Sequence, residues 1–251
     1  LLEHRGPDHQ DICYANSVSF AHTRLSIVDV AHGHQPLVSP DDRYYLICNG
    51  EIYNHQDWRD RLHDVYDFQT DTDSEVIIAL YQAYGLDALK HLDGMFAFAL
   101  YDAVEDTIIL ARDPIGIKPL YYGWMDETLY FASEIKALQH VCDDIREFLP
   151  GHYYTPDTGM VKYYDLAQLS EDAYQRGVDS DVAFSDIYTS LKAAVDKRLM
   201  ADVPVGVYLS GGLDSTIVAS LVAQTMPDVH SFSVGVSGSS DLENARIAAQ
   251  Y

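Results

Sequence analysis

Short apolar or alternating segments, separated by turn residues, dominate the first 165 residues of the chain. They are rich in Val, Ile, Tyr and Phe, which favour pleated, half-buried strands. We therefore expect strands at 18–28, 44–53, 95–101, 107–112 and 129–132. Many strands with few helices indicate an α+β arrangement, in which antiparallel sheets are stacked and helices lie on the outside.

One segment of this strand-rich region has the periodicity of a helix. Apolar residues recur on one helical face from Val76 to Tyr84, and Gly85 follows as a stop signal. Asp73 or Ser74 is the expected N-cap. A second, shorter helix is expected over 87–92.

The pattern changes after residue 165. Residues 166–184 are polar, acidic and weakly periodic, which predicts a linker. Apolar residues then recur every four positions from Ile187 to Leu199, which predicts an amphipathic helix. A continuous apolar strand at 203–209, a helix around 217–222 and an alternating strand at 232–236 follow, as in the first βαβ unit of a parallel sheet. We thus expect domains at 1–165 and 185–251.

Composition excludes several functional classes. The chain carries 39 Asp and Glu against 16 Lys and Arg, a net charge of −23, which repels nucleic acid and anionic lipid surfaces. Its apolar runs are too short to span a bilayer. Three scattered cysteines form no disulfide framework and favour a reducing, cytoplasmic location.

Both ends of the chain are unusual. It begins with Leu1 rather than Met and enters the loop His4–Asp8 at once. Residues 242–251 have a helical pattern with no stop signal. We therefore expect the sequence to be an internal piece of a longer protein.

The glycine-rich loop SGGLDS at 210–215 has the features of an anion site. It lies between the carboxyl end of a predicted strand and the start of a helix, where free backbone N–H groups favour phosphate. It is not a Walker A loop, because no Gly-Lys-Ser/Thr follows. Asp214 beside a pyrophosphate would need a cation, most simply Mg²⁺. On its own, the loop could equally be an ordinary glycine turn with a Ser or Asp helix cap.

This loop resembles the PP-loop of ATP pyrophosphatases, which are adenine nucleotide α-hydrolase-like domains. The first half carries, in order, HRGPD (4–8), AHTRLSIVD (21–29), GHQPL (33–37), NGEIYNH (49–55), TDTDSEV (70–76), LDGMFAFALYD (92–102), ARDPIGIKPLYY (111–122) and ASEIKAL (132–138). Together these motifs resemble the bacterial type of glutamine-hydrolysing asparagine synthetases. The resemblance implies an N-terminal-nucleophile glutaminase domain with αββα layers, followed by an α/β parallel-sheet domain.

The resemblance also implies a reaction. Members of the family are carbon–nitrogen ligases with glutamine as the amido-N donor. They hydrolyse glutamine to ammonia and use ATP and Mg²⁺ to convert aspartate to β-aspartyl-AMP, which ammonia turns into asparagine. Such an enzyme implies glutamine, aspartate and ATP as small-molecule partners, with no nucleic acid and no membrane. Whether the enzyme forms a homodimer stays open.

The family's glutamine site falls on five residues of this chain. Arg24 resembles the clamp of the glutamine α-carboxylate, a bidentate task suited to guanidinium. Asn49 and Gly50 match the oxyanion hole, and Glu51 and Asp73 match the acids that hold the α-ammonium group. Taken singly, Asn49-Gly50 indicates a hairpin turn, Asp73 a helix cap and Arg24 a surface ion pair.

The family's ATP site falls on the second region. Leu209 and Val234 match contacts to the nucleoside, and Asp214 matches the magnesium ligand. The pyrophosphate would be held by the loop residues Ser210, Gly211, Gly212, Asp214 and Ser215.

Several functional parts that the family resemblance implies are not found in these 251 residues. The family's nucleophile is a cysteine at the mature N-terminus, and none of Cys13, Cys48 and Cys142 aligns with it; Cys48 is expected to be an inert core thiol. The aspartate pocket and a later catalytic lysine should lie beyond Tyr251. We expect the 251 residues alone to be inactive. Two alternatives stay open: a relative that amidates another carboxylate, such as a β-lactam synthetase-like or a peptide- or exopolysaccharide-amidating enzyme, and a non-catalytic glutamine-binding fragment.

Overall fold

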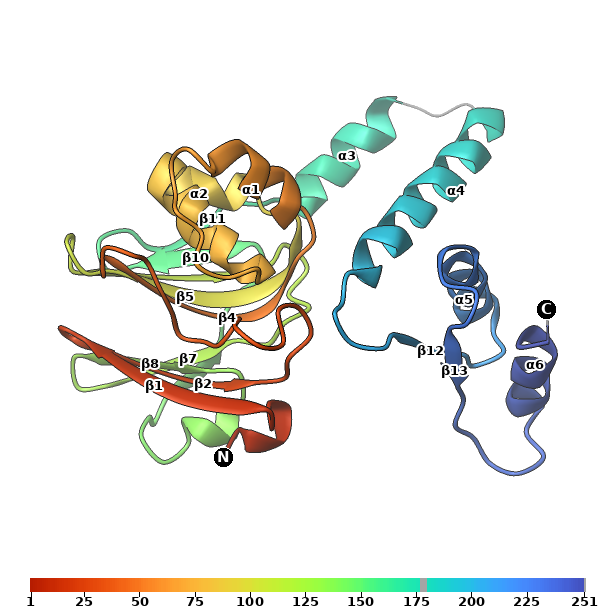
Figure 1. Ribbon diagram of the computed structural model, residues 1–251, viewed down its shortest axis with the longest axis horizontal. Coiled ribbons are helices and arrows are strands. Elements are labelled where there is room, and N and C mark those ends of the chain that lie inside the picture. Colours follow the sequence, from red (N-terminus) through yellow and green to blue (C-terminus); the bar gives the residue numbers. More distant parts are fainter. Residues whose placement is uncertain (177–179, 251) are drawn as a thin grey trace. The chain divides into compact units, whose positions relative to one another are not determined.

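The computed structural model describes residues 1–176 and 180–250, with the backbone alone over 172–183. The chain divides into two compact units, Leu1–Gln175 and Arg176–Tyr251 (Figure 1). Each unit has its own elements and its own core.

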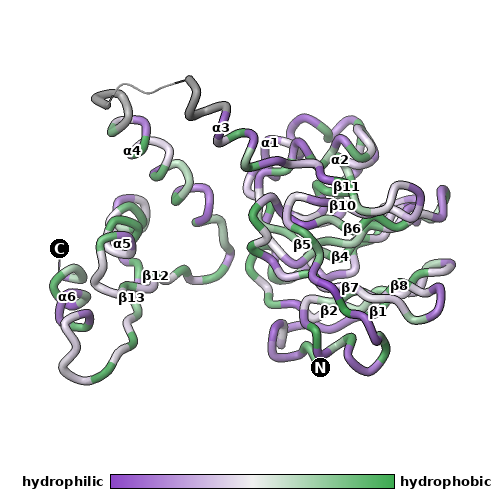
Figure 2. Tube along the Cα trace, turned by 180° about the vertical axis from the view of Figure 1, so that it is seen from behind, coloured by the Kyte–Doolittle hydropathy of each residue, from purple (hydrophilic) through white to green (hydrophobic). Residues whose placement is uncertain are grey.

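A six-stranded antiparallel sheet forms the centre of the first unit. Its order is β11-β10-β6-β5-β4-β3. The strands span Leu37–Val38 (β3), Tyr44–Ile52 (β4), Gly94–Asp102 (β5), Thr107–Arg112 (β6), His152–Thr155 (β10) and Gly159–Lys162 (β11). Figure 2 shows the hydrophobic residues gathered along the central strands, because both faces of these strands are covered.

Two helices cover one face of this sheet (Figure 1). They are α1 (His55–Leu62) and α2 (Val76–Tyr84), accompanied by the short 3₁₀ helices η2 (Asp73–Glu75) and η3 (Gly85–Lys90). Phe96, Phe98 and Leu100 of β5 point into the core beneath these helices. The intervening Ala97, Ala99 and Tyr101 point into the core on the other face, as the alternation of a strand requires.

Two small antiparallel sheets lie on that other face (Figure 1). One pairs β1 (His9–Ala15) with β2 (Val18–Arg24); the other has the order β8-β7-β9, from Thr128–Ala132, Tyr121–Met125 and Ile145–Glu147. Phe20 and Phe148 fill the core between the layers. The unit therefore shows three of the four expected layers, and the described residues beyond the small sheets form only short 3₁₀ turns, η1 (Glu3–Arg5) and η4 (Ile135–Ala137).

The second unit is a small α/β fragment. Helix α4 (Ser180–Asp196) and the turn η5 (Lys197–Leu199) precede β12 (Gly206–Tyr208), α5 (Leu213–Thr225), β13 (His230–Phe232) and α6 (Ser240–Ala248). β12 and β13 pair in parallel. Leu221 and Val222 of α5 pack with Val195 of α4, and this contact forms the unit's core.

The structure corrects several expectations about the elements. The expected linker 166–184 contains helix α3 (Leu166–Arg176) and the start of α4, which begins at Ser180 rather than near Ser185. The last helix ends at Ala248, before the final residues. The sequence did not predict helix α1 or strands β1, β3, β7, β9, β10 and β11, because these segments are short or mix charged residues with apolar ones.

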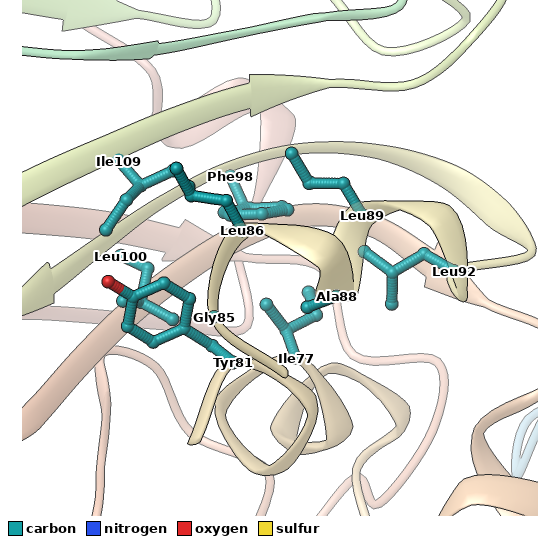
Figure 3. Close-up of a pocket in the computed structure, with 10 residues that line it drawn as sticks. All are labelled: Ile77, Tyr81, Gly85, Leu86, Ala88, Leu89, Leu92, Phe98, Leu100 and Ile109. Carbon is teal, nitrogen blue, oxygen red and sulfur yellow. The ribbon is translucent and has the colours of Figure 1, made fainter. Parts of the chain in front are cut away.

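A small cavity lies beneath α2 and η3. Apolar groups line it almost completely, with Ile77 and Tyr81 on one side and Leu86 and Leu89 on another (Figure 3). Its volume of about 10 Å³ is room for roughly one water molecule. It is a packing defect of the core rather than a substrate site.

Candidate functional site

Strand β4 carries the predicted Asn49-Gly50-Glu51 segment in its interior. The three residues pair with Ala97, Phe96 and Met95 of β5, so the hairpin-turn alternative is wrong. The alternation of β4 places Tyr45 and Ile47 in the core between the sheets. Asn49 and Glu51 follow on that same face.

Gly50 occupies a position that only glycine fits. Its φ is +153°, and a Cβ atom there would lie 2.0 Å from the Met95 carbonyl oxygen and 2.7 Å from the Phe96 Cα. The missing side chain allows β4 and β5 to approach closely at this point.

The outer edge of β4 runs past the end of the two-residue strand β3, and side chains take over its pairing. The side-chain amide of Gln35 donates to the Cys48 carbonyl at 3.1 Å and accepts from the Cys48 N–H at 2.6 Å. Four residues later, the Asp73 carboxylate accepts the Ile52 N–H at 2.5 Å. The N–H of Gly50 is directed toward the same edge, between these two bonded positions.

Next to this edge, Asn49 has an unusual side chain. Its Nδ2 atom is buried and has no hydrogen-bond partner among the described residues. A buried donor without a partner costs about 1–3 kcal/mol unless a ligand satisfies it. The Asn49 amide and the Gly50 N–H are two donors that could stabilise one developing oxyanion.

Arg24 ends strand β2 and is 5% exposed, so it is not the surface residue of the ion-pair alternative. Its guanidinium donates to the carbonyl oxygens of Val28 and Asp29 at 2.8 Å each and to that of Val30 at 3.3 Å. These bonds explain why β2 stops at Arg24 although the apolar pattern continues to Val28. The segment after the strand wraps around the guanidinium instead of continuing the sheet.

The acids of the predicted site are the half-buried Glu51 and the buried Asp73, whose negative charges repel each other. Burial and then the charge of Asp73 raise the pKa of Glu51 to about 8. Burial also raises the pKa of Asp73, although hydrogen bonds from backbone and side-chain donors oppose the shift. Asp73 is not the N-cap of α2, because its carboxylate binds the Ile52 N–H and no side-chain cap bond forms there. Two close carboxylates of raised pKa make a site for a cation such as an ammonium group.

The three cysteines are free thiols, and each has a raised pKa. Burial is the largest cause in each case, and it is strongest at Cys48. A thiolate nucleophile needs a lowered pKa, so the prediction that Cys48 is an inert core thiol fits its surroundings.

Two residues of this region were not singled out from the sequence. Gln35 lies within the quoted GHQPL motif, but a glutamine in a loop carries no chemical signal of its own. His22, in β2, places its Nε2 atom 3.3 Å from the same Cys48 carbonyl. Burial lowers the pKa of His22 to about 4, so the ring is neutral near pH 7.

In the second unit, the loop 210–215 joins β12 to α5. Ser210 and Ser215 share a 2.8 Å hydroxyl contact, and the Gly212 N–H donates to the Ser210 hydroxyl at 3.3 Å. Gly212 is the N-cap of α5, and no side chain caps that helix start. The ordinary Ser or Asp cap of the alternative reading is therefore wrong, and the N–H groups at this helix start can bind an anion.

Gly211 explains why the loop needs glycine. Its φ is +79°, and a Cβ atom would lie 2.5 Å from the Asp241 carbonyl oxygen and 2.6 Å from the Ala245 nitrogen of α6. The loop therefore packs directly against the start of that helix.

The other residues assigned to nucleotide binding lie before, within and beyond the loop along the chain. Leu209 is buried, and its N–H donates to the Phe232 carbonyl at 2.8 Å. Val234 is 96% exposed, just beyond β13. Asp214 is exposed in the first turn of α5. Over residues 1–176 and 180–250, no group of three or more His, Cys, Asp or Glu is arranged to hold a metal, so a cation at Asp214 would need oxygen ligands from the phosphates or water.

Comparison with known proteins identifies both regions. Residues 1–149 match the family model of the glutamine amidotransferase domain, and residues 186–251 match that of asparagine synthase. A probable glutamine-hydrolyzing asparagine synthetase of Schizosaccharomyces pombe is 43% identical over 273 residues, and asparagine synthetase B of Escherichia coli is 43% identical over 267. Each alignment covers 100% of this chain and 48% of the relative, so the chain spans about half the length of these relatives.

A solved structure supports the fold. The allosteric regulatory enzyme of purine biosynthesis matches 90% of this chain and 55% of its own, with a TM-score of 0.50 and 20% identity. At that identity the likeness concerns the fold alone. Together with the family match, it confirms the N-terminal-nucleophile glutaminase fold predicted for the first region. No helix in the described part of the chain has the length and apolarity needed to cross a membrane.

Proposed function

Because the chain belongs to the glutamine amidotransferase family through residues 1–149, we propose that its whole protein is a glutamine-hydrolysing asparagine synthetase. The first unit releases ammonia from glutamine. The second activates the β-carboxylate of aspartate with ATP, giving β-aspartyl-AMP and pyrophosphate. Ammonia then displaces AMP to form asparagine.

Two hydrogen-bond donors, from Asn49 and Gly50, are the main support for the proposed glutaminase reaction. The buried, unpartnered Nδ2 of Asn49 and the N–H of Gly50 would stabilise the oxyanion formed when a thiolate attacks the side-chain carbonyl of glutamine. This pair of donors is the observation that most favours an acyl-transfer site over a glutamine-binding module without activity, which would have no need of an unsatisfied donor.

The ends of glutamine would be held by groups of opposite charge. The carboxylates of Glu51 and Asp73 suit the α-ammonium group, whose positive charge would offset the repulsion between these two acids. Arg24 would bind the α-carboxylate. Its guanidinium donates three hydrogen bonds to carbonyl oxygens, which leaves two of its five N–H groups for the carboxylate.

The nucleophile is proposed to lie outside the 251 residues. None of the three thiols has the lowered pKa that a nucleophile needs. A cysteine whose own α-amine acts as base, as the family resemblance implies, would attack the carbon that faces Asn49 and Gly50.

The loop 210–215 is proposed to bind the pyrophosphate part of ATP, with Leu209 and Val234 near the nucleoside. The hydroxyl groups of Ser210 and Ser215 and the free N–H groups of α5 are suitable donors. One exposed carboxylate beside substrate phosphates also suits Mg²⁺, which would neutralise phosphate charge next to Asp214.

We propose that the protein acts in the cytoplasm, without nucleic acid or membrane, on glutamine, aspartate and ATP. The net charge of −23 and the three free cysteines favour this location. A homodimer is the assembly to test by light scattering.

The full-length enzyme allows the two half-reactions to be separated. Asn49→Ala should lower glutamine hydrolysis by about 100- to 1,000-fold while ammonia still supports asparagine synthesis. Asp214→Asn should abolish ATP-dependent synthesis and leave glutamine hydrolysis in place. Pyrophosphate release that does not depend on aspartate would reject asparagine synthesis. Loss of both activities in either variant would mean that the two sites are assigned wrongly.

A further inference from the structure

The edge of β4 beside Asn49 is completed by a side chain instead of a strand. β3 pairs with β4 in antiparallel register, with Leu37 opposite Leu46. Extending that register by two residues in each strand places Gln35 opposite Cys48. In a regular ladder these two residues would exchange two backbone hydrogen bonds.

At this point the Gln35 side chain replaces the backbone. Its carboxamide accepts from the Cys48 N–H at 2.6 Å and donates to the Cys48 carbonyl at 3.1 Å. A carboxamide carries the same donor and acceptor as a peptide group, so it satisfies both edge groups of Cys48. Gln35 is 6% exposed, and water cannot readily substitute for these bonds.

A second side chain supports the same carbonyl. The Nε2 atom of His22 lies 3.3 Å from the Cys48 oxygen, and the neutral ring can donate from that nitrogen. The Cys48 backbone is thus held by β2 and by the loop before β3, immediately ahead of Asn49. On the other side of Gly50, Asp73 holds Ile52.

We propose that Gln35 is a positioning residue for glutamine hydrolysis, which fixes the β4 backbone at Cys48 so that the Asn49 amide and the Gly50 N–H converge on one point. This inference rests on the proposed function. Gln35 touches no substrate: it acts through the main chain of the neighbouring residue. Its loss should therefore weaken stabilisation of the transition state while leaving the groups that hold the ends of glutamine in place.

The size of the effect follows from the geometry. Removing one oxyanion donor lowers kcat by roughly 100- to 1,000-fold, and misplacing a group by 1 Å can cost about 100-fold. Gln35→Met keeps a similar side-chain length but removes both hydrogen bonds. It should lower kcat for glutamine hydrolysis by about 10- to 100-fold, with KM for glutamine changed less than about twofold.

The experiment uses the full-length enzyme with Gln35→Met and a matched control, Gln82→Met. Gln82 also donates to a backbone carbonyl, that of Val65 at 3.2 Å, but it is exposed on α2. Each protein is assayed for glutamine hydrolysis, ammonia-dependent synthesis and inhibition by a γ-aldehyde analogue of glutamine, which becomes tetrahedral on the nucleophilic thiol. Gln35→Met should bind the aldehyde at least about 10-fold more weakly, and the control should match the wild type in all three.

Hydrogen exchange of the backbone amides over residues 44–52 tests whether Gln35 fixes strand β4, without relying on activity. Exchange should be faster in Gln35→Met and unchanged in Gln82→Met. Unchanged exchange, a kcat within about twofold of the wild type, or a parallel loss of ammonia-dependent synthesis would each overturn the proposal. If the wild type hydrolyses no glutamine, the proposed function fails, and the exchange data still decide whether Gln35 fixes the strand.

Discussion

Replacing Asn49 should lower activity and raise stability in the same variant. Its Nδ2 atom is buried without a partner, so the folded protein carries the cost of an unsatisfied donor. That cost is about 1–3 kcal/mol. Asn49→Leu has a similar volume and no donor, so it should stabilise the first unit by an amount in this range, equivalent to a rise in Tm of a few degrees.

The same substitution removes one of the two donors proposed for the oxyanion. We expect kcat for glutamine hydrolysis to fall by about 100- to 1,000-fold, while ammonia-dependent synthesis is retained. The assays are glutamate release by the full-length enzyme and thermal unfolding of its first unit.

Asn54 provides the control, because both ends of its side chain are satisfied. Nδ2 donates to the His91 carbonyl at 2.8 Å, and Oδ1 accepts from the Asp93 N–H at 3.1 Å. Asn54→Leu should therefore lower Tm and leave glutamine hydrolysis nearly unchanged. A lower Tm in Asn49→Leu, or a kcat that hardly changes, would refute the reasoning that Asn49 is a donor kept free for the reaction.

Three further substitutions follow from the site geometry. Gly50→Ala should destabilise the first unit by about 3 kcal/mol or more in urea unfolding, because its Cβ would overlap the Met95 carbonyl; unchanged stability would contradict the close approach of the strands. Gly211→Ala should raise KM for ATP by at least about 10-fold and spare glutamine hydrolysis, since its Cβ would strike α6; an unchanged KM would contradict the tight packing of that loop. Glu51→Gln should raise Tm at pH 9 and much less at pH 5, and also raise KM for glutamine. The pKa of Glu51 is raised in the folded state to about 8, so the wild type loses stability as pH rises from about 4.5 to 8; an equal change in Tm at both pH values would contradict the raised pKa.

The fold was predictable where the pattern depends on local sequence. β6 has the predicted bounds, and β4 and β5 differ from theirs by a single residue at each differing end, because each strand contains an unbroken run of apolar residues that are buried or half-buried. Helix α1 was missed, since charged residues occupy most of its exposed turns and only His55, Trp58 and Leu62 are buried. Helix α3 was missed because polar residues with a weak repeat can also form a helix.

The site was predictable in its residues but not in its contacts. The family resemblance indicated Arg24, Asn49, Gly50, Glu51 and Asp73, and the structure gathers the last four along β4 and its outer edge. The three hydrogen bonds from Arg24 to the carbonyl oxygens of residues 28–30 could not be predicted, because they require the chain to leave the sheet after β2. Nor could the two hydrogen bonds between the Gln35 side chain and the Cys48 backbone, because a side chain that replaces a backbone ladder is recognised only from the register.

The edge of β4 also shows how one strand can be stable and reactive at once. An unpaired edge exposes backbone groups that normally need partners. Here the Gln35 side chain bonds the N–H and the carbonyl of Cys48, and the Asp73 carboxylate accepts the N–H of Ile52. The backbone is therefore fixed on both sides of Gly50. We interpret the remaining donors of this edge as the reactive part of the site.

The central claim is that the whole protein moves the amide nitrogen of glutamine to aspartate. The most direct measurement supplies full-length enzyme with amide-¹⁵N glutamine, aspartate and ATP, and follows ¹⁵N in asparagine together with pyrophosphate. We predict ¹⁵N-labelled asparagine with one pyrophosphate released for each molecule formed, and none without aspartate. Hydrolysis of glutamine with no labelled asparagine and no aspartate-dependent pyrophosphate would contradict the account.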